Sequence, residues 1–431
     1  MTKHRCGWLA VTGLIIFTLL LLSACDNPAP TSSSAIRMGL ANLPVNFDPR
    51  FATDATSERF NQLLYSSLVQ LNAQSLPIPD LADWTSINQQ HYRFTLARPV
   101  YFDNGQRLTV DDVLATYRFV LDPTKLSPHR QTLAHIAHLQ AVGTSSFEVL
   151  LSQADPLLPA KMTLGILPAD AIENDHDFQH VPIGSGDYRL LQKVAANRLL
   201  LQRKSDRQLL QLHQVKEPLT RVLKLLRGEL DLLQNDLPPE LGAYLAAQKG
   251  IKHLSLPGSN FTYIGLNMQD PLTGNPLIRQ AIAHAIDRQQ IIQHVFKQAA
   301  LTAESILPPQ HWAGHPQLTA YSYNPDKARA LLQAAGFDDS KPLQLTYKTS
   351  SDPFRIKLAT IIQAQLAKVN IHLTIKSYDW GTFFGDIKKG NFQIYSLSWV
   401  GIKTPDIYQR VFHSKSKPPE GANRGRYHSS L

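Results

Sequence analysis

Apolar residues recur along this chain with two spacings, one typical of strands and the other of helices. Alternation with a period of two residues predicts strands at 36–40, 92–96, 343–347, 371–375 and 393–399. Apolar positions three and four residues apart predict helices at 110–121, 276–295, 325–335 and 354–368. Strands that alternate with helices along the chain predict mixed α/β lobes.

Single residues mark the ends of several of these elements. Thr109 is placed to cap the first predicted helix, and Asp122-Pro123 ends that helix. Asn324-Pro325 opens a later helix, which Gly336 closes as a C-terminal cap. The glycines of Gly184-Ser185-Gly186 predict a loop in which glycine permits a positive φ.

The first residues combine a positively charged start with an apolar run and a cysteine. The apolar run extends from Trp8 to Leu22 and is shorter than the about 20 residues that comfortably span a bilayer. It leads into Leu22-Ser23-Ala24-Cys25, which resembles the lipobox of bacterial lipoproteins. The resemblance implies a signal peptide at 1–24, lipid on Cys25, and retention at the periplasmic face of the inner membrane through Asp26. An uncleaved membrane anchor that ends in a chance cysteine is the alternative.

Length and composition limit the class of protein further. A chain of 431 residues exceeds what one hydrophobic core usually supports, so two or more lobes are expected. The net charge of +9 comes from scattered basic residues, with a loose cluster at 198–207, and this excludes the concentrated basic surface of a nucleic-acid-binding protein. Cys6 and Cys25 are the only cysteines, so the mature chain has no disulfide. Residues 25–35 have the composition of a tether.

Catalytic and cofactor motifs are missing from the sequence. Gly184-Ser185-Gly186 lacks the spacing of a nucleophile elbow, and the chain has neither a Walker loop nor a dinucleotide fingerprint. The pairs His311/His315 and His135/His138 could each face one metal from a helix. Pro308-Pro309 predicts a loop at the first pair, however, and no carboxylate accompanies the second. We therefore expect no enzyme activity, no cofactor and no metal site.

Five segments follow one another with a shared pattern of turns, caps and apolar faces. They are Tyr92–Val113, Pro182–Tyr188, Leu226–Asp231, Asn267–Arg288 and Tyr323–Phe337. In this order they resemble the motifs of the family 5 extracellular solute-binding proteins, which include dipeptide, oligopeptide and nickel binders. The resemblance runs from about residue 36 to the last residue. It implies an α/β, two-lobed periplasmic-binding-protein-like fold of class II, with an extra subdomain in the first lobe.

The same resemblance implies how the chain is organised and what it does. Lobe I would comprise residues 36–260, with an inserted subdomain at about 65–180, and lobe II residues 261–431. The implied protein is the substrate-binding lipoprotein of an ABC importer, in which two lobes close on an extended solute. Its partners would be a small peptide or similar solute, the permease and ATPase subunits in the inner membrane, and the membrane itself through the lipid. A monomer is expected, without nucleic acid.

Ligand contacts are implied near the end of the chain. Ser398-Trp399-Val400-Gly401 resembles the segment that lines the family's cleft, where Trp399 offers rigid apolar area, with a plain core role as the alternative. Arg355 stands where dipeptide-binding relatives carry an arginine that faces the ligand carboxylate, with an exposed helix-start arginine as the alternative. Asn46, in Asn46-Phe47-Asp48-Pro49, completes the predicted contacts.

Two departures from the family pattern leave the ligand open. Peptide-binding relatives carry a carboxylate for the peptide ammonium three residues beyond the tryptophan, where this chain has Ile402. Asp406 is a candidate substitute, with a cap or turn role as the alternative. Relatives continue beyond the segment that matches 421–427, so lobe II is predicted to be incomplete at its C-terminal end. The alternatives to a peptide carrier are therefore the same fold with a non-peptide solute such as a metal chelate, and a non-transporting envelope lipoprotein.

Overall fold

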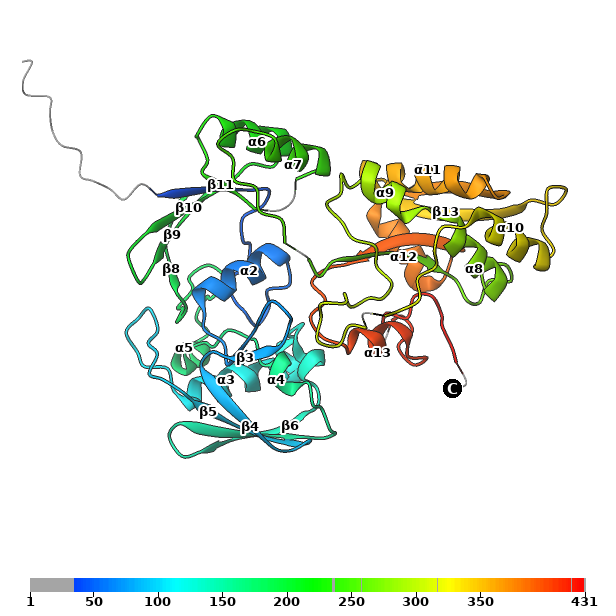
Figure 1. The fold of residues 1–431 in the computed structure, drawn as a ribbon. Coiled ribbons are helices and arrows are strands. Elements are labelled where there is room, and N and C mark those ends of the chain that lie inside the picture. The colour runs from blue at the N-terminus through cyan, green and yellow to red at the C-terminus, as the bar shows by residue number, and fades with distance from the viewer. Residues whose placement is uncertain (1–34, 235–236, 257, 316, 420, 430–431) are drawn as a thin grey trace, which may run out of the picture.

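The computed structural model describes residues 35–429 apart from 235–236, 257, 316 and 420. Two bodies lie side by side, and we call them lobe I and lobe II (Figure 1). Lobe I ends with α7 (Pro239–Ala246), and lobe II begins with β12 (Phe261–Leu266). We call residues 247–260 between them the crossing segment. The predicted signal peptide, the predicted lipidation site Cys25 and nearly all of the predicted tether lie outside the described residues.

The first sheet of lobe I has the strand order β11-β1-β10-β9-β8. Its strands are β1 (Ile36–Leu40), β8 (Tyr188–Ala195), β9 (Arg198–Arg203), β10 (Leu209–Gln214) and β11 (Leu232–Leu233). Parallel pairing of β1 with both β10 and β11 places the first strand inside the sheet. The core on this sheet includes Leu64, from α2 (Ala55–Leu64), and Leu201 and Leu212. α6 (Pro218–Leu226) follows β10 in the chain.

The second sheet of lobe I is antiparallel and has the order β4-β5-β7-β6. It comprises β4 (Ala82–Asn88), β5 (His91–Leu96), β6 (Ile136–Val142) and β7 (Ser146–Leu151). Around it lie β2 (Val69–Leu71), β3 (Pro77–Pro79), α3 (Val110–Leu121), α4 (Leu158–Lys161), α5 (Ala169–Glu173) and the 3-10 turns Pro123–Lys125 and Arg130–Leu133. Phe94, Phe147 and Tyr117 are fully buried in a separate apolar core. Lobe I therefore has two cores.

Two glycines bring the loop before β8 into backbone contact with the end of α2. A Cβ on Gly184 would lie 2.0 Å from the Leu64 carbonyl oxygen, and one on Gly186 would lie 2.5 Å from that of Leu63. The Gly186 N–H donates to the Leu64 carbonyl at 2.8 Å. Neither glycine is among the residues with a positive φ, so the predicted reason for them is wrong. The glycines are required because the backbone of α2 passes too close for any side chain.

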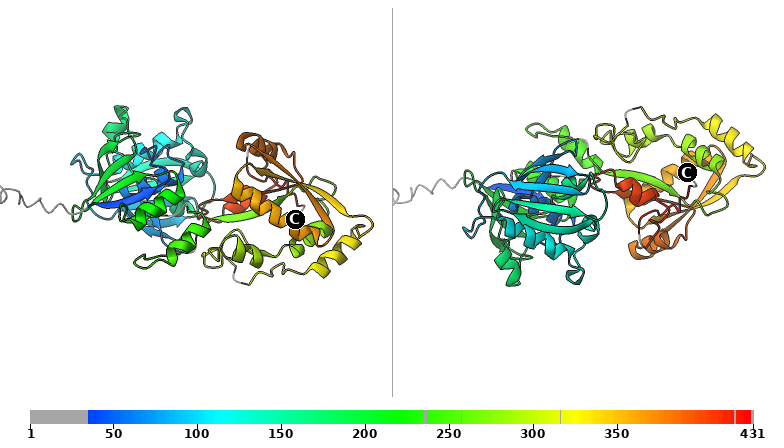
Figure 2. Two further views of the ribbon diagram at one scale, coloured as in Figure 1. Left: turned by 90° about the horizontal axis from the view of Figure 1, so that it is seen from above. Right: turned by 90° about the horizontal axis from the view of Figure 1, so that it is seen from below.

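Lobe II contains one sheet with the order β12-β15-β13-β14. Its later strands are β13 (Leu343–Ser350), β14 (Ile371–Tyr378) and β15 (Ile394–Trp399). Its helices, seen from two further directions in Figure 2, are α8 (Pro276–Ala285), α9 (Arg288–His294), α10 (Pro325–Ala334), α11 (Pro353–Ala367), α12 (Trp380–Lys389) and α13 (Ile407–Phe412). The main core joins α8, α10 and α11 to the sheet, and a smaller one lies beneath α12. No helix among the described residues has both the length and the apolar character needed to cross a membrane.

Most predicted elements are confirmed, and one is wrong. The strand at 36–40 and the helix at 110–121 have the predicted bounds, and Gly336 adopts φ +86° after α10. The single helix predicted at 276–295 is in fact two, α8 and α9. Ile286 is extended between them, and the carboxylate of Asp287 accepts the Gln290 N–H to cap the second helix. A local cap therefore interrupts a continuous apolar periodicity.

Candidate ligand-binding site

The last two residues of β15 form the centre of the candidate site. β15 is an interior strand between β12 and β13, so its position is fixed by ladders on both sides. Ser398 lies opposite Thr262 and Trp399 opposite Phe261 on β12. The hydroxyls of Ser398 and Thr262 share a hydrogen bond of 2.7 Å. Both side chains at the end of β15 are only partly buried.

Arg355 reaches this strand end from the first turn of α11. Its backbone N–H donates to the Asp352 carboxylate that caps the helix, and its Nη2 donates to the Ser398 Oγ at 2.8 Å. Its Nη1 is buried and has no hydrogen-bond partner among the described residues. Burial raises the pKa of the neighbouring Tyr347 to about 12, so this hydroxyl stays neutral. The guanidinium is therefore held at one edge by Ser398, while its buried Nη1 has no hydrogen-bond partner among the described residues.

Trp399 lies among cationic side chains. The guanidinium of Arg424 is 4.5 Å from the centre of its ring, and that of Arg410 is 5.8 Å away. Such contacts hold an indole in place without covering it fully. Val400 is 67% exposed. Gly401 has φ +66°, and its N–H donates to the Asn260 Oδ1 at 3.1 Å.

Ile402 is buried within lobe II in a small apolar cluster with Ile306 and Leu307. Trp399 packs against the same cluster. Its N–H donates to the carbonyl of Ser259 in the crossing segment at 3.3 Å. A carboxylate at position 402 would therefore be buried among apolar groups in this arrangement, which is unfavourable.

Asp406 connects lobe II to lobe I just before α13. One of its carboxylate oxygens lies 3.6 Å from the Nζ of Lys161, the last residue of α4 (Figure 1). Lys161 also lies 2.8 Å from the carboxylate of Asp155, and both of these side chains are about nine-tenths buried. Lys161 and Asp155 were not predictable as site residues, because the contact joins distant segments that carry no motif.

A second ion pair joins the lobes at a different place. The Nζ of Lys357 on α11 lies 3.1 Å from the carboxylate of Glu240 on α7. The N–H of Glu240 itself and the Lys357 ammonium lower the pKa of Glu240. Both side chains are half exposed.

Asn46 lies apart from the other predicted residues. It sits in the loop after β1, where its carboxamide oxygen accepts the Asp48 N–H at 2.8 Å. Its own N–H donates to the Ser57 Oγ of α2 at 3.1 Å. The structure thus brings Arg355, Ser398 and Trp399 together, while the recorded contacts of Asn46 are those of a turn.

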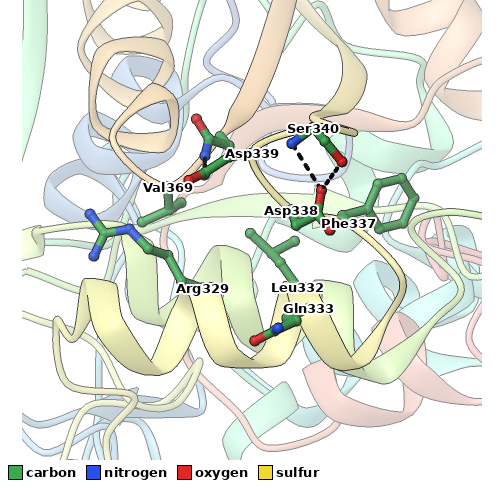
Figure 3. Close-up of a pocket in the computed structure, with 9 residues that line it drawn as sticks. Arg329, Leu332, Gln333, Phe337, Asp338, Asp339, Ser340 and Val369 are labelled. Atoms are coloured by element: carbon green, nitrogen blue, oxygen red, sulfur yellow. Dashed lines mark hydrogen bonds between the residues drawn. The ribbon is translucent and has the colours of Figure 1, made fainter.

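The pocket and the histidines considered as metal ligands are not part of the candidate site. A pocket of about 440 Å³ lies between the end of α10 and the loop before β13, and Figure 3 shows its lining, which includes Arg329, Asp338 and Asp339. It contains none of the predicted ligand contacts. His311 is buried, with its Nε2 3.1 Å from the Lys403 carbonyl, and His135 lies 3.8 Å from Asp155. Among the described residues, no three metal-binding side chains gather in one place.

Known proteins resemble this chain over most of its length. The family described as bacterial extracellular solute-binding proteins, family 5 Middle, matches residues 74–418. The dipeptide-binding protein of Escherichia coli (strain K12) is 23% identical over 427 residues, covering 89% of this chain and 79% of the relative. Heme-binding protein A of Haemophilus influenzae is 23% identical over 434 residues, with the same two coverages of 89% and 79%. The solved structure of the ABC transporter substrate-binding protein CtaP from Listeria monocytogenes matches with a TM-score of 0.82 at 21% identity, covering 92% of this chain and 84% of that one. The predicted two-lobed α/β fold is thereby confirmed.

Proposed function

This chain belongs to the bacterial extracellular solute-binding proteins of family 5, and from this premise we propose that it captures a small peptide or similar solute between its lobes. It hands the solute to an ABC permease and carries out no chemistry itself. The observation that supports this role is the guanidinium of Arg355, whose buried Nη1 has no partner in the described part of the chain. An unpaired buried donor on a fixed cation is suited to a carboxylate that arrives with the solute.

The end of β15 supplies the rest of the proposed grip. Ser398 orients Arg355, and Trp399 presents a partly exposed indole beside it. An aromatic ring of this kind provides apolar contact without selecting one side chain. The exposed Val400 follows the end of the strand, where the backbone of an extended peptide can pair with it. A site that holds a peptide by backbone pairing and one ion pair accepts peptides of many sequences.

The cellular setting remains part of the proposal. We place the protein in the periplasm, held at the inner membrane by lipid on Cys25, as a monomer that works with permease and ATPase subunits. The lipobox resemblance at 22–25 supports the anchor. A monomer is sufficient to enclose a solute, because both lobes belong to one chain, each has its own core, and the two face each other.

A second candidate function keeps the fold and changes the solute. Ile402 is buried where peptide-binding relatives carry the carboxylate for the peptide ammonium. One relative is named for heme rather than for a peptide. These two observations favour a non-peptide anion as the alternative cargo.

Titration calorimetry with the purified full chain tests the proposal. We expect a carboxylate-bearing peptide such as N-acetyl-trialanine to bind, and Arg355→Gln to weaken it about 10- to 100-fold, as loss of a charge-assisted hydrogen-bond pair does. Arg329→Gln is the matched control, because this arginine lies in the pocket of Figure 3, away from β15. Failure of every peptide to bind, or equal binding by Arg355→Gln, would remove the proposed role.

A further inference from the structure

Asp406 already has a partner for each of its carboxylate oxygens. One oxygen accepts the hydroxyl of Thr404, and the other faces the Lys161 ammonium at 3.6 Å. Lys161 comes from the opposite lobe, and its side chain is only 10% exposed. An ammonium from the protein itself therefore occupies Asp406, the only acidic side chain after Trp399 in the part of the chain that the structure describes.

The lobe I side of this contact is also occupied. Asp155 accepts the N–H of Leu157 at 3.1 Å and the Lys161 ammonium at 2.8 Å. The ring of His135 lies 3.8 Å from the same carboxylate. Both carboxylates that face Lys161 therefore already have partners within the protein.

The charge that remains free at the site is positive. Arg355 has no carboxylate within ion-pair distance among the residues described, although Asp352 accepts its backbone N–H. Arg424 and Arg410 face the ring of Trp399, and Arg424 donates to the Tyr263 hydroxyl rather than to an acid. A solute that enters here meets unneutralised cations.

We infer that the cleft selects solutes that carry a carboxylate and no free ammonium, such as N-acylated peptides, and that Lys161 sets this selection by occupying Asp406. The inference rests on the proposed function, because it concerns which solute the same site takes. A solute ammonium at Asp406 would have to share this carboxylate with the Lys161 ammonium, which Asp155 also holds in place at 2.8 Å. Two like charges would then meet at one carboxylate, which is unfavourable. An acylated amine carries no such charge and needs only a hydrogen-bond acceptor.

Three probes test the selection on the purified full chain. They are trialanine, N-acetyl-trialanine and trialanine amide, compared by titration calorimetry at one pH and salt concentration. We expect N-acetyl-trialanine to bind about tenfold more tightly than trialanine, and the amide to bind most weakly. If no probe binds, the proposed capture of peptides fails. If probes bind but trialanine equals or exceeds its acetylated form, the capture role stands and the selection is wrong.

A pair of variants separates selection from stability. Asp155→Asn with Lys161→Met removes the ammonium and its lobe I partner together, so that Asp155 is not left as a lone buried charge. Asp406 is then free, and the ratio of the two affinities should move about tenfold toward trialanine. Lys357→Met, at the exposed contact between the lobes, is the control and should leave the ratio unchanged. A purely structural role for Lys161 would weaken both probes alike and would contradict the inference.

Discussion

The lobes meet through two ion pairs that use the same chemistry in different surroundings. The contact of Lys161 with Asp155 and Asp406 is mostly buried, with exposed fractions of 10%, 8% and 35%. The contact of Glu240 with Lys357 has both side chains about half exposed. Water and salt screen the exposed pair, whereas a buried ammonium that loses its partner cannot be rehydrated without moving the chain. Burial, and not the number of pairs, therefore decides which contact the fold depends on.

The largest expected effect comes from removing one member of the buried contact. Lys161→Met leaves Asp155 buried without its ammonium, so we expect the free energy of unfolding of lobe I to fall by about 3 kcal/mol. Urea unfolding followed by circular dichroism measures this loss. The matched change Lys357→Met should alter stability by less than about 0.5 kcal/mol. Equal losses of unfolding free energy in the two variants would show that burial does not distinguish the two contacts.

A smaller effect is expected when the charge and its partner are removed together. Asp155→Asn with Lys161→Met leaves no charge behind, and the amide oxygen can still accept the Leu157 N–H. We expect the double variant to lie within about 1 kcal/mol of the unchanged protein in the same urea experiment. A double variant as unstable as Lys161→Met alone would show that packing, and not an uncompensated carboxylate, causes the loss.

The smallest expected effect concerns the exposed contact and pH. The pKa of Glu240 is lowered in the folded chain, so its pairing stabilises the protein above the pKa of the unfolded chain and is lost as pH falls through the folded pKa. Glu240→Gln should therefore destabilise the protein by at most about 0.5 kcal/mol near neutral pH. The difference should shrink as the pH falls below the ordinary glutamate pKa, and vanish once the pH is below the lowered pKa of the folded chain. Thermal unfolding over a series of pH values measures it, and a difference that grows on acidification would contradict the assigned pairing.

Local signals in the sequence predict the helices and strands better than they predict contacts between distant segments. Thr109 and Asp112 form the cap of α3 within four residues, and the Thr109 N–H donates to the Asp112 carboxylate at 2.7 Å. Gly336 likewise ends α10 as its sequence indicates. The prediction of one helix at 276–295 is wrong, because α8 and α9 bury apolar side chains in the same core while the cap at Asp287 separates them. Periodicity alone does not detect a change of backbone direction between two helices that share a core.

The candidate site was predictable only in part. Ser398, Trp399 and Arg355 lie together, and the family motifs had placed them in one cleft. Their role as ligand contacts remains a prediction, as do those of Asn46 and Asp406. Lys161 could not be found from the sequence, because its partner Asp406 comes from the other lobe and neither residue has a motif around it. The burial of Ile402 is equally non-local, since it depends on Ile306 and Leu307.

The strand end that holds Trp399 is also bonded to the crossing segment. The Gly401 N–H donates to the side chain of Asn260, and the Ile402 N–H donates to the Ser259 carbonyl. A solute that shifts the backbone at Gly401 would therefore move the crossing segment directly, because the two are hydrogen-bonded. The angle between the lobes would then depend on how the solute lies against Gly401, and the apolar cores of the lobes would not have to transmit the change.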